Sequence, residues 1–167
     1  MDIPYILRRR RQAPYDDAPN KSPMRWLSFL VRVALGGLLL VTGALKVAHP
    51  EALAAAIAGF RLLPQAAIVP LAVALPYVEL LLGLYLVLGL FTRIAGSLVC
   101  IQFAMYAAAV ASAVLRGIPA NCGCFGPNDR ATADWPHVVI DLILAGIAAL
   151  VVRVGPGALA LDRRLSR

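Results

Sequence analysis

The sequence predicts an all-α fold: a polytopic membrane protein that forms a four-transmembrane-helix bundle, with a short interfacial helix between spans one and two. Of the 167 residues, 60% are hydrophobic and 15% are charged, whereas soluble domains are about 45–50% apolar and about 25% charged. The mean hydropathy is +0.78. Short polar connections separate four stretches of roughly 20 apolar residues, the length needed to cross a bilayer.

The first predicted span covers residues 24–47 and contains Arg32, with Lys46 near its end. Charged side chains at membrane depth are unfavourable unless they find a partner or reach an interface. The helix rise between these two residues is only about 21 Å. We therefore expect the two side chains to extend their charges towards opposite interfaces.

The short interfacial helix is predicted over residues 51–60, whose composition is helical and amphipathic enough to lie on a membrane surface. The second span follows at residues 66–90. It is interrupted by Pro70 and Pro76 and carries one acid, Glu79, which is expected near the middle of the membrane.

The third predicted span, residues 94–115, has no charged residue. The fourth, residues 135–152, is short and begins at Trp135, a residue type that often anchors a helix at the interface. Asp141 follows one to two turns later, roughly 9 Å below that surface.

The distribution of lysine and arginine predicts the orientation of the bundle. The net charge is +7, from 16 basic and 9 acidic residues. Eleven basic residues lie on the side that holds both termini: Arg8, Arg9, Arg10, Arg11, Lys21, Arg25, Arg93, Arg153, Arg163, Arg164 and Arg167. Four lie on the other side: Lys46, Arg61, Arg116 and Arg130. By the positive-inside rule both termini are expected to be cytoplasmic, and no nucleic-acid partner is expected.

The chain divides into a basic, proline-containing cytoplasmic tail (1–24), the membrane domain (25–155) and a second basic cytoplasmic tail (156–167). The first 24 residues lack the apolar run of a cleavable signal peptide, so we expect the first span to direct insertion. The expected location is the bacterial inner (cytoplasmic) membrane, in contact with the lipid bilayer.

The connection between spans three and four carries the most informative motif, Asn-Cys-Gly-Cys-Phe-Gly at residues 121–126. Cys122 and Cys124 fall in a loop predicted to face the periplasm, an oxidising compartment in which disulfides persist. So short a crosslink gains little from chain entropy. It is also expected to be strained, and strained, exposed disulfides exchange readily. These features favour a redox-active pair.

Two other roles stay open for this pair: a static staple of the turn, or a ligand pair for a metal or cofactor that recruits Asp134, His137 or His49. The chain lacks the ligand spacing of a four-ligand zinc site, and we expect no metal. Cys100 lies about 24 Å of helix rise from Arg116, so it is expected to be a buried, inert thiol.

Four motifs in this chain resemble the MauE branch of the DoxX-like membrane proteins. They are Gly-Gly-Leu-Leu-Leu at 36–40 with Lys46, Phe-Arg-Leu-Leu-Pro at 60–64, Leu-Pro-Tyr-Val-Glu at 75–79 with Gly83, and the cysteine motif at 121–126. The resemblance covers roughly residues 27–153. It implies a four-helix membrane domain linked to thiol redox chemistry.

MauE-type proteins are associated with maturation of a disulfide-rich periplasmic methylamine dehydrogenase subunit, and DoxX-like relatives with quinone-linked sulfur metabolism. The resemblance thus makes a quinone one candidate electron acceptor, with no tightly bound cofactor expected. Quinone-coupled disulfide generators use two cysteine pairs, whereas this chain has one pair and the isolated Cys100. A complete relay would need that pair to meet both partners, or a second protein to supply thiols.

The ionisable residues within and beside the spans predict a supporting polar site. We expect Asp141 and Lys46, with Arg61, to cluster beneath the cysteine loop, or else to join the helices as an ion pair. A nearby cation favours a reactive thiolate, and Lys46, Arg61 and Arg116 are the candidates. Glu79 is expected either to form a structural hydrogen bond or to handle protons.

The function these observations favour is thiol–disulfide exchange or disulfide formation in a periplasmic protein or redox-complex subunit, with Cys122 and Cys124 as the redox pair. If the chain is an enzyme, it is a thiol–disulfide oxidoreductase. The alternative is a noncatalytic subunit or assembly factor of a larger complex, whose Cys-Gly-Cys loop only shapes a docking surface. A small-solute transporter is disfavoured because the spans contain few polar cavity-lining residues.

Overall fold

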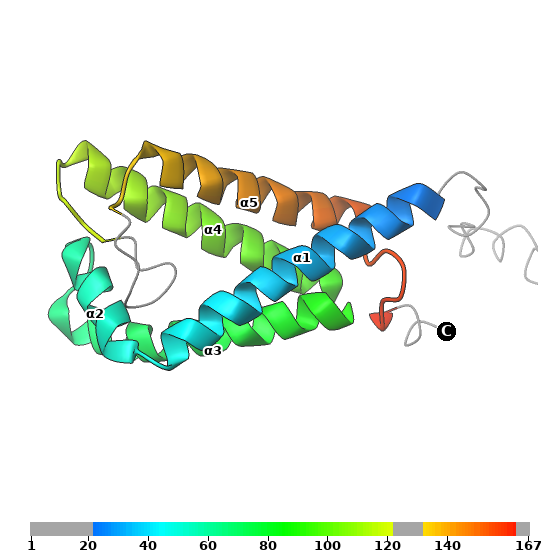
Figure 1. Cartoon of the computed structure of the whole chain (residues 1–167), viewed down its shortest axis with the longest axis horizontal. Coiled ribbons are helices and arrows are strands. Elements are labelled where there is room, and N and C mark those ends of the chain that lie inside the picture. Colours follow the sequence, from blue (N-terminus) through cyan, green and yellow to red (C-terminus); the bar gives the residue numbers. More distant parts are fainter. Residues whose placement is uncertain (1–21, 122–131, 163–167) are drawn as a thin grey trace, which may run out of the picture.

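The computed structural model describes residues 22–121 and 132–162. In these ranges the chain forms five helices: α1 (Ser22–Val47), α2 (Pro50–Gly59), α3 (Gln65–Leu88), α4 (Thr92–Leu115) and α5 (Trp135–Val154). All except α2 are long and apolar enough to cross a membrane. The predicted all-α, four-span bundle with a short helix between the first two spans is therefore confirmed (Figure 1).

The long helices pack mainly as two antiparallel pairs, α1 with α3 and α4 with α5. Helix α2 lies across one end of the bundle, which we call the α2 end (Figure 1). The segment after α5 lies at the opposite end, which we call the C-terminal end. A bridge between Asn121 and Thr132, with a 2.8 Å hydrogen bond from Ala133 N to the Ala120 carbonyl, joins the chain before and after residues 122–131 at the α2 end.

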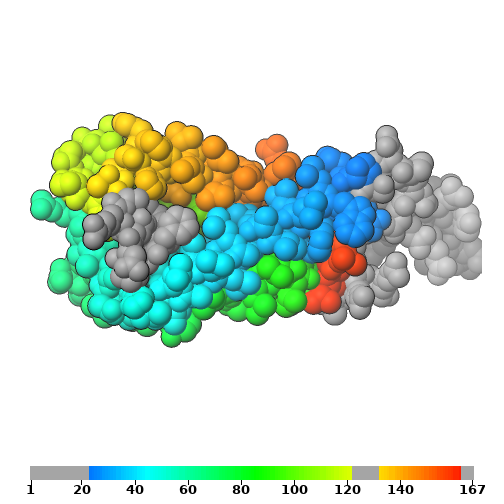
Figure 2. Space-filling model, viewed as in Figure 1, coloured from blue at the N-terminus to red at the C-terminus, as the bar shows by residue number. Residues whose placement is uncertain are grey.

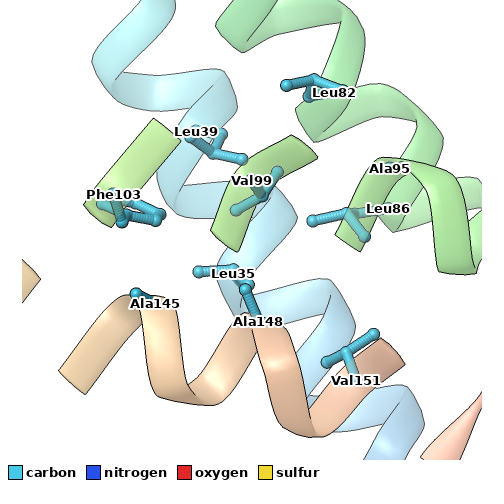
Figure 3. Close-up of a cluster of buried hydrophobic side chains, with 10 residues drawn as sticks. All are labelled: Leu35, Leu39, Leu82, Leu86, Ala95, Val99, Phe103, Ala145, Ala148 and Val151. Atoms are coloured by element: carbon cyan, nitrogen blue, oxygen red, sulfur yellow. The ribbon is translucent and has the colours of Figure 1, made fainter. Parts of the chain in front are cut away.

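All four long helices contribute to one hydrophobic core (Figure 3). The buried residues are Leu35, Leu39, Leu82, Leu86, Ala95, Val99, Phe103, Ala145, Ala148 and Val151. The outer faces also carry large apolar side chains, for example Leu30, Val69, Ile94, Ile101 and Ile140, each more than half exposed. Such extensive exposed apolar surface suits contact with lipid rather than water.

Helices α1 and α3 cross at two glycines. A Cβ atom on Gly36 would lie 2.8 Å from the Gly83 carbonyl oxygen, and one on Gly83 would lie 2.8 Å from the Gly36 carbonyl oxygen. Small residues at such crossings allow transmembrane helices to pack backbone against backbone. This contact sets the register between α1 and α3.

Two neighbouring glycines of α1 therefore differ in their expected tolerance of alanine. Gly36→Ala forces the helices apart and is expected to destabilise the protein by about 1–3 kcal/mol. Gly37→Ala is the matched control, because a Cβ there meets no atom within 4 Å. Thermal unfolding in detergent measures both, and equal unfolding temperatures for the two variants would contradict the crossing described above.

The segment after α5, up to Asp162, folds back onto the bundle. Ala158 and Ala160 are buried, and Figure 2 shows this segment, in red, against α1 and α3. The Asp162 carboxylate accepts hydrogen bonds from the backbone N–H groups of Phe91 (2.7 Å) and Thr92 (2.8 Å) at the start of α4. The first turn of a helix leaves such N–H groups without partners, and an acidic residue satisfies them.

Arg32 reaches the C-terminal end of the bundle, where the segment after α5 supplies its hydrogen-bond acceptors. Its side chain is fully buried and donates to the carbonyl oxygens of Pro156 (2.9 Å) and Ala158 (3.5 Å). The guanidinium lies against Gly89, where a Cβ atom would come within 1.7 Å of Arg32 Nη1. The φ of 67° at this position also favours glycine. The folded-back segment thus supplies the acceptors that burial of the guanidinium requires.

Candidate functional site

A buried ion pair joins α1 to α3. Lys46 Nζ lies 2.7 Å from Glu79 Oε1 and 2.9 Å from Oε2, and the two side chains are 7% and 1% exposed. Lys46 is in the last turn of α1, and Glu79 lies between Pro76 and Gly83 on the face of α3 that meets α1. The close crossing at Gly36 and Gly83 brings these helix faces within reach of each other.

Helix α4 completes this group with two polar side chains one turn apart. Gln102 Nε2 donates to Glu79 Oε1 at 3.0 Å and to the Tyr106 hydroxyl at 2.9 Å, and that hydroxyl donates to Glu79 Oε1 at 2.6 Å. Lys46 Nζ also lies 5.5 Å from the centre of the Tyr106 ring, within range of a cation–π interaction. We call Lys46, Glu79, Gln102 and Tyr106 the polar cluster. Its charges are paired, as burial requires.

Helix α5 adds a second set of ionisable groups near the α2 end. Asp134 caps α5 by accepting a 3.1 Å hydrogen bond from His137 N, and its Oδ1 lies 2.5 Å from His137 Nδ1. The side-chain hydrogen bond with His137, together with the one from its backbone N–H, holds the pKa of the Asp134 carboxyl below its usual value. Asp141, one turn further along, is buried and 7% exposed.

Three buried oxygen atoms among the described residues lack a hydrogen-bond partner: Asp141 Oδ2, Gln102 Oε1 and, at the start of α4, Thr92 Oγ1. Buried polar atoms are nearly always satisfied by protein or ordered water. Lys46 acts electrostatically on Asp141, and Asp141 on Tyr106. The unsatisfied oxygens of Asp141 and Gln102 therefore belong to the surroundings of the polar cluster and can accept a hydrogen bond from water or a proton there.

Two cavities adjoin Lys46. The first, of about 200 Å³, has apolar walls from α2, α3, α4 and the segment after α2, and we call it the apolar cavity. Lys46 and Tyr106 supply its polar groups, and two of its wall residues, Leu71 and Met105, are exposed on the outer surface of the bundle. The second, of about 400 Å³, lies between the end of α1, α2 and residues 119–121, and we call it the end cavity. Lys46 lines both cavities.

The structure brings Lys46 and Glu79 of the predicted supporting residues into direct contact and places Arg61 and Arg116 apart from them. Lys46 forms its ion pair with Glu79, whereas the sequence analysis predicted a cluster of Lys46 with Asp141 and Arg61. Arg61 is exposed, with a φ of 51° where the chain turns from α2 towards α3. Arg116 is exposed too and donates to the carbonyls of Phe60 and Arg61, which ties the end of α4 to the end of α2. These two arginines therefore lie outside the polar cluster.

Cys122 and Cys124 lie outside the described residues. Asn121, the residue immediately before Cys122, lines the end cavity together with Lys46. Cys100 is partly buried and packs against the hydrophobic core, as a small apolar residue would. In the part of the chain that is described, no group of three or more His, Cys, Asp or Glu residues is placed to hold a metal ion.

Sequence reasoning missed Gln102 and Tyr106. The third span contains no charged residue, and the sequence analysis therefore predicted no polar site on it. The available signal was an amide and a phenol four residues apart within an apolar helix, which places both on one face.

Comparisons with known proteins agree with this architecture. The family model described as methylamine utilisation protein MauE matches residues 24–154. The Methylamine utilization protein MauE of Paracoccus denitrificans is 30% identical over 129 residues, which are 77% of this chain and 69% of that protein. No solved structure matches. The matched region includes the polar cluster and the cysteine motif.

Proposed function

This chain belongs to the MauE family of membrane proteins, and from that premise we propose that it is a thiol–disulfide redox protein of methylamine utilisation. In this proposal Cys122 and Cys124 form or exchange disulfides in a periplasmic partner. The protein lies in the bacterial inner membrane with both termini in the cytoplasm, so the α2 end faces the periplasm.

One observation carries the proposal: Lys46 belongs to the buried polar cluster and lines the end cavity with Asn121, next to Cys122. The chain that leads into the cysteine motif thus lines the same cavity as Lys46. A cation near a thiol favours the thiolate, which is the nucleophile of disulfide exchange. Arg116, six residues before Cys122, adds positive charge at the same end.

We further propose a quinone as the electron acceptor, bound in the apolar cavity. The lining supports this choice, because apolar walls suit a ring with an isoprenoid tail. The Lys46 ammonium has three N–H donors and contacts two oxygens of Glu79, so one donor remains for a carbonyl oxygen. Exposure of Leu71 and Met105 on the lipid-facing surface gives a membrane-soluble molecule a lateral approach. Because Lys46 lines both cavities, this one residue borders both the proposed quinone site and the cavity that Asn121 lines.

Thiol labelling of intact cells with a membrane-impermeant alkylating reagent tests this function. We expect Cys122 and Cys124 to be labelled only after treatment with a reductant, because they form a disulfide at rest on the periplasmic side. Cys100 in the membrane serves as the internal control and should stay unlabelled in both samples. Labelling of the pair without reductant would contradict a resting disulfide, and absence of labelling after reduction would contradict the orientation.

A further inference from the structure

We propose that Asp134, His137 and Asp141 form a proton path along α5, from the surface of the α2 end to the polar cluster. The inference rests on the proposed function. There, two cysteine thiols lose two electrons and two protons to become a disulfide, and a quinone gains two electrons and two protons to become a quinol. The thiols release their protons to water. The apolar cavity has almost no polar lining, so protons need polar groups to reach the quinone.

The outer end of the path is the pair of Asp134 and His137. Their side chains are 47% and 24% exposed, so Asp134 meets water and His137 lies mostly inside. The distance of 2.5 Å between Asp134 Oδ1 and His137 Nδ1 allows direct proton transfer. An imidazole can accept a proton at one ring nitrogen and donate one from the other, and the paired carboxylate orients the ring.

The middle of the path is Asp141. It follows His137 by four residues, so the two side chains lie on one face of α5, separated by a rise of about 6 Å. Asp141 is 7% exposed and its Oδ2 has no donor. A buried aspartate kept only to join helices would have both oxygens paired, so this atom is better suited to accept a proton or an ordered water.

The inner end of the path is the polar cluster. The ionisable groups around Asp141 are His137 on its own helix, Lys46 on α1 and Tyr106 on α4, with Glu79 bonded to both Lys46 and Tyr106. Gln102 Oε1, a second buried oxygen without a donor, belongs to this cluster. A water between these groups would complete the connection from Asp141 to Tyr106, which lines the apolar cavity.

The test compares Asp141→Asn with wild type, both purified and placed in lipid vesicles. Two rates are measured: oxidation of the reduced cysteine pair by a short-chain quinone, and oxidation by diamide, a soluble oxidant that does not use the cavity. We expect Asp141→Asn to slow the quinone reaction by about 100-fold, a typical effect of losing a positioned proton carrier. The diamide reaction should keep its wild-type rate. Asp141→Glu should restore much of the quinone rate.

Glu51→Gln is the matched control, because this acid is exposed on α2 away from the path. It should retain the wild-type quinone rate. Infrared difference spectra on quinone reduction supply a second readout, a carboxylic-acid band that disappears in Asp141→Asn. A wild-type quinone rate in Asp141→Asn, or an unchanged band, would overturn the path while leaving the proposed function intact. A wild-type protein that reacts with diamide but never with quinone would overturn the quinone-linked function itself.

Discussion

Glu79→Leu is expected to destabilise the protein by about 3–5 kcal/mol, the usual effect of removing one partner from a buried ion pair. The side chain of Lys46 is only 7% exposed and its two short contacts are both with Glu79. The substitution would therefore leave the ammonium buried beside apolar walls. Thermal unfolding in detergent measures the loss.

The double variant Lys46→Met with Glu79→Leu provides the decisive comparison. It removes both charges, and Gln102 and Tyr106 keep the hydrogen bond they form with each other. Its stability should return close to that of wild type, while quinone reduction should be lost with the polar groups. Glu51→Leu, at an exposed acid, should leave stability unchanged. A stable Glu79→Leu single variant would contradict the buried pair, and a fully active double variant would show that the cluster only joins helices.

Cys122→Ser and Cys124→Ser are each expected to abolish oxidation of the periplasmic partner, while the protein stays inserted and abundant. The physical reason is that exchange needs both sulfurs, one to attack or be attacked and the other to leave. The redox state of the partner is read by thiol trapping in cells, and the amount of membrane protein by immunodetection.

Cys100→Ser is the matched control, since that thiol packs against the hydrophobic core of the bundle. It should leave partner oxidation unchanged. Normal partner oxidation in either loop variant would favour the alternative, a noncatalytic assembly factor whose Cys-Gly-Cys loop shapes a docking surface. Loss of partner oxidation in Cys100→Ser at a normal protein level would instead indicate a second thiol in the relay.

Hydropathy alone was sufficient to predict the spans, because the requirement to cross a bilayer fixes their length and composition. Each predicted helix agrees with the structure to within two residues at either end. Pro70 and Pro76 did not end the second span, since α3 continues through both.

The pairing of Lys46 could not be predicted, because it depends on which helix faces α1 and at what register. The crossing at Gly36 and Gly83 settles both and places Glu79, rather than Asp141, opposite the lysine. The same limit applies to Arg32, whose acceptors come from a segment more than 120 residues away along the chain. Long-range contacts of this kind leave no local pattern in the sequence.

The redox response of Cys122 and Cys124 to quinone tests the central proposal most directly. The protein is reduced in lipid vesicles, freed of reductant, exposed to a short-chain quinone and then labelled with a thiol reagent after solubilisation. We expect quinone to protect both cysteines from labelling and to yield one quinol for each disulfide. Ala109→Trp, which fills the apolar cavity from α4, should prevent this protection. Cysteines that stay fully labelled with quinone, yet become protected with diamide, would contradict the proposal.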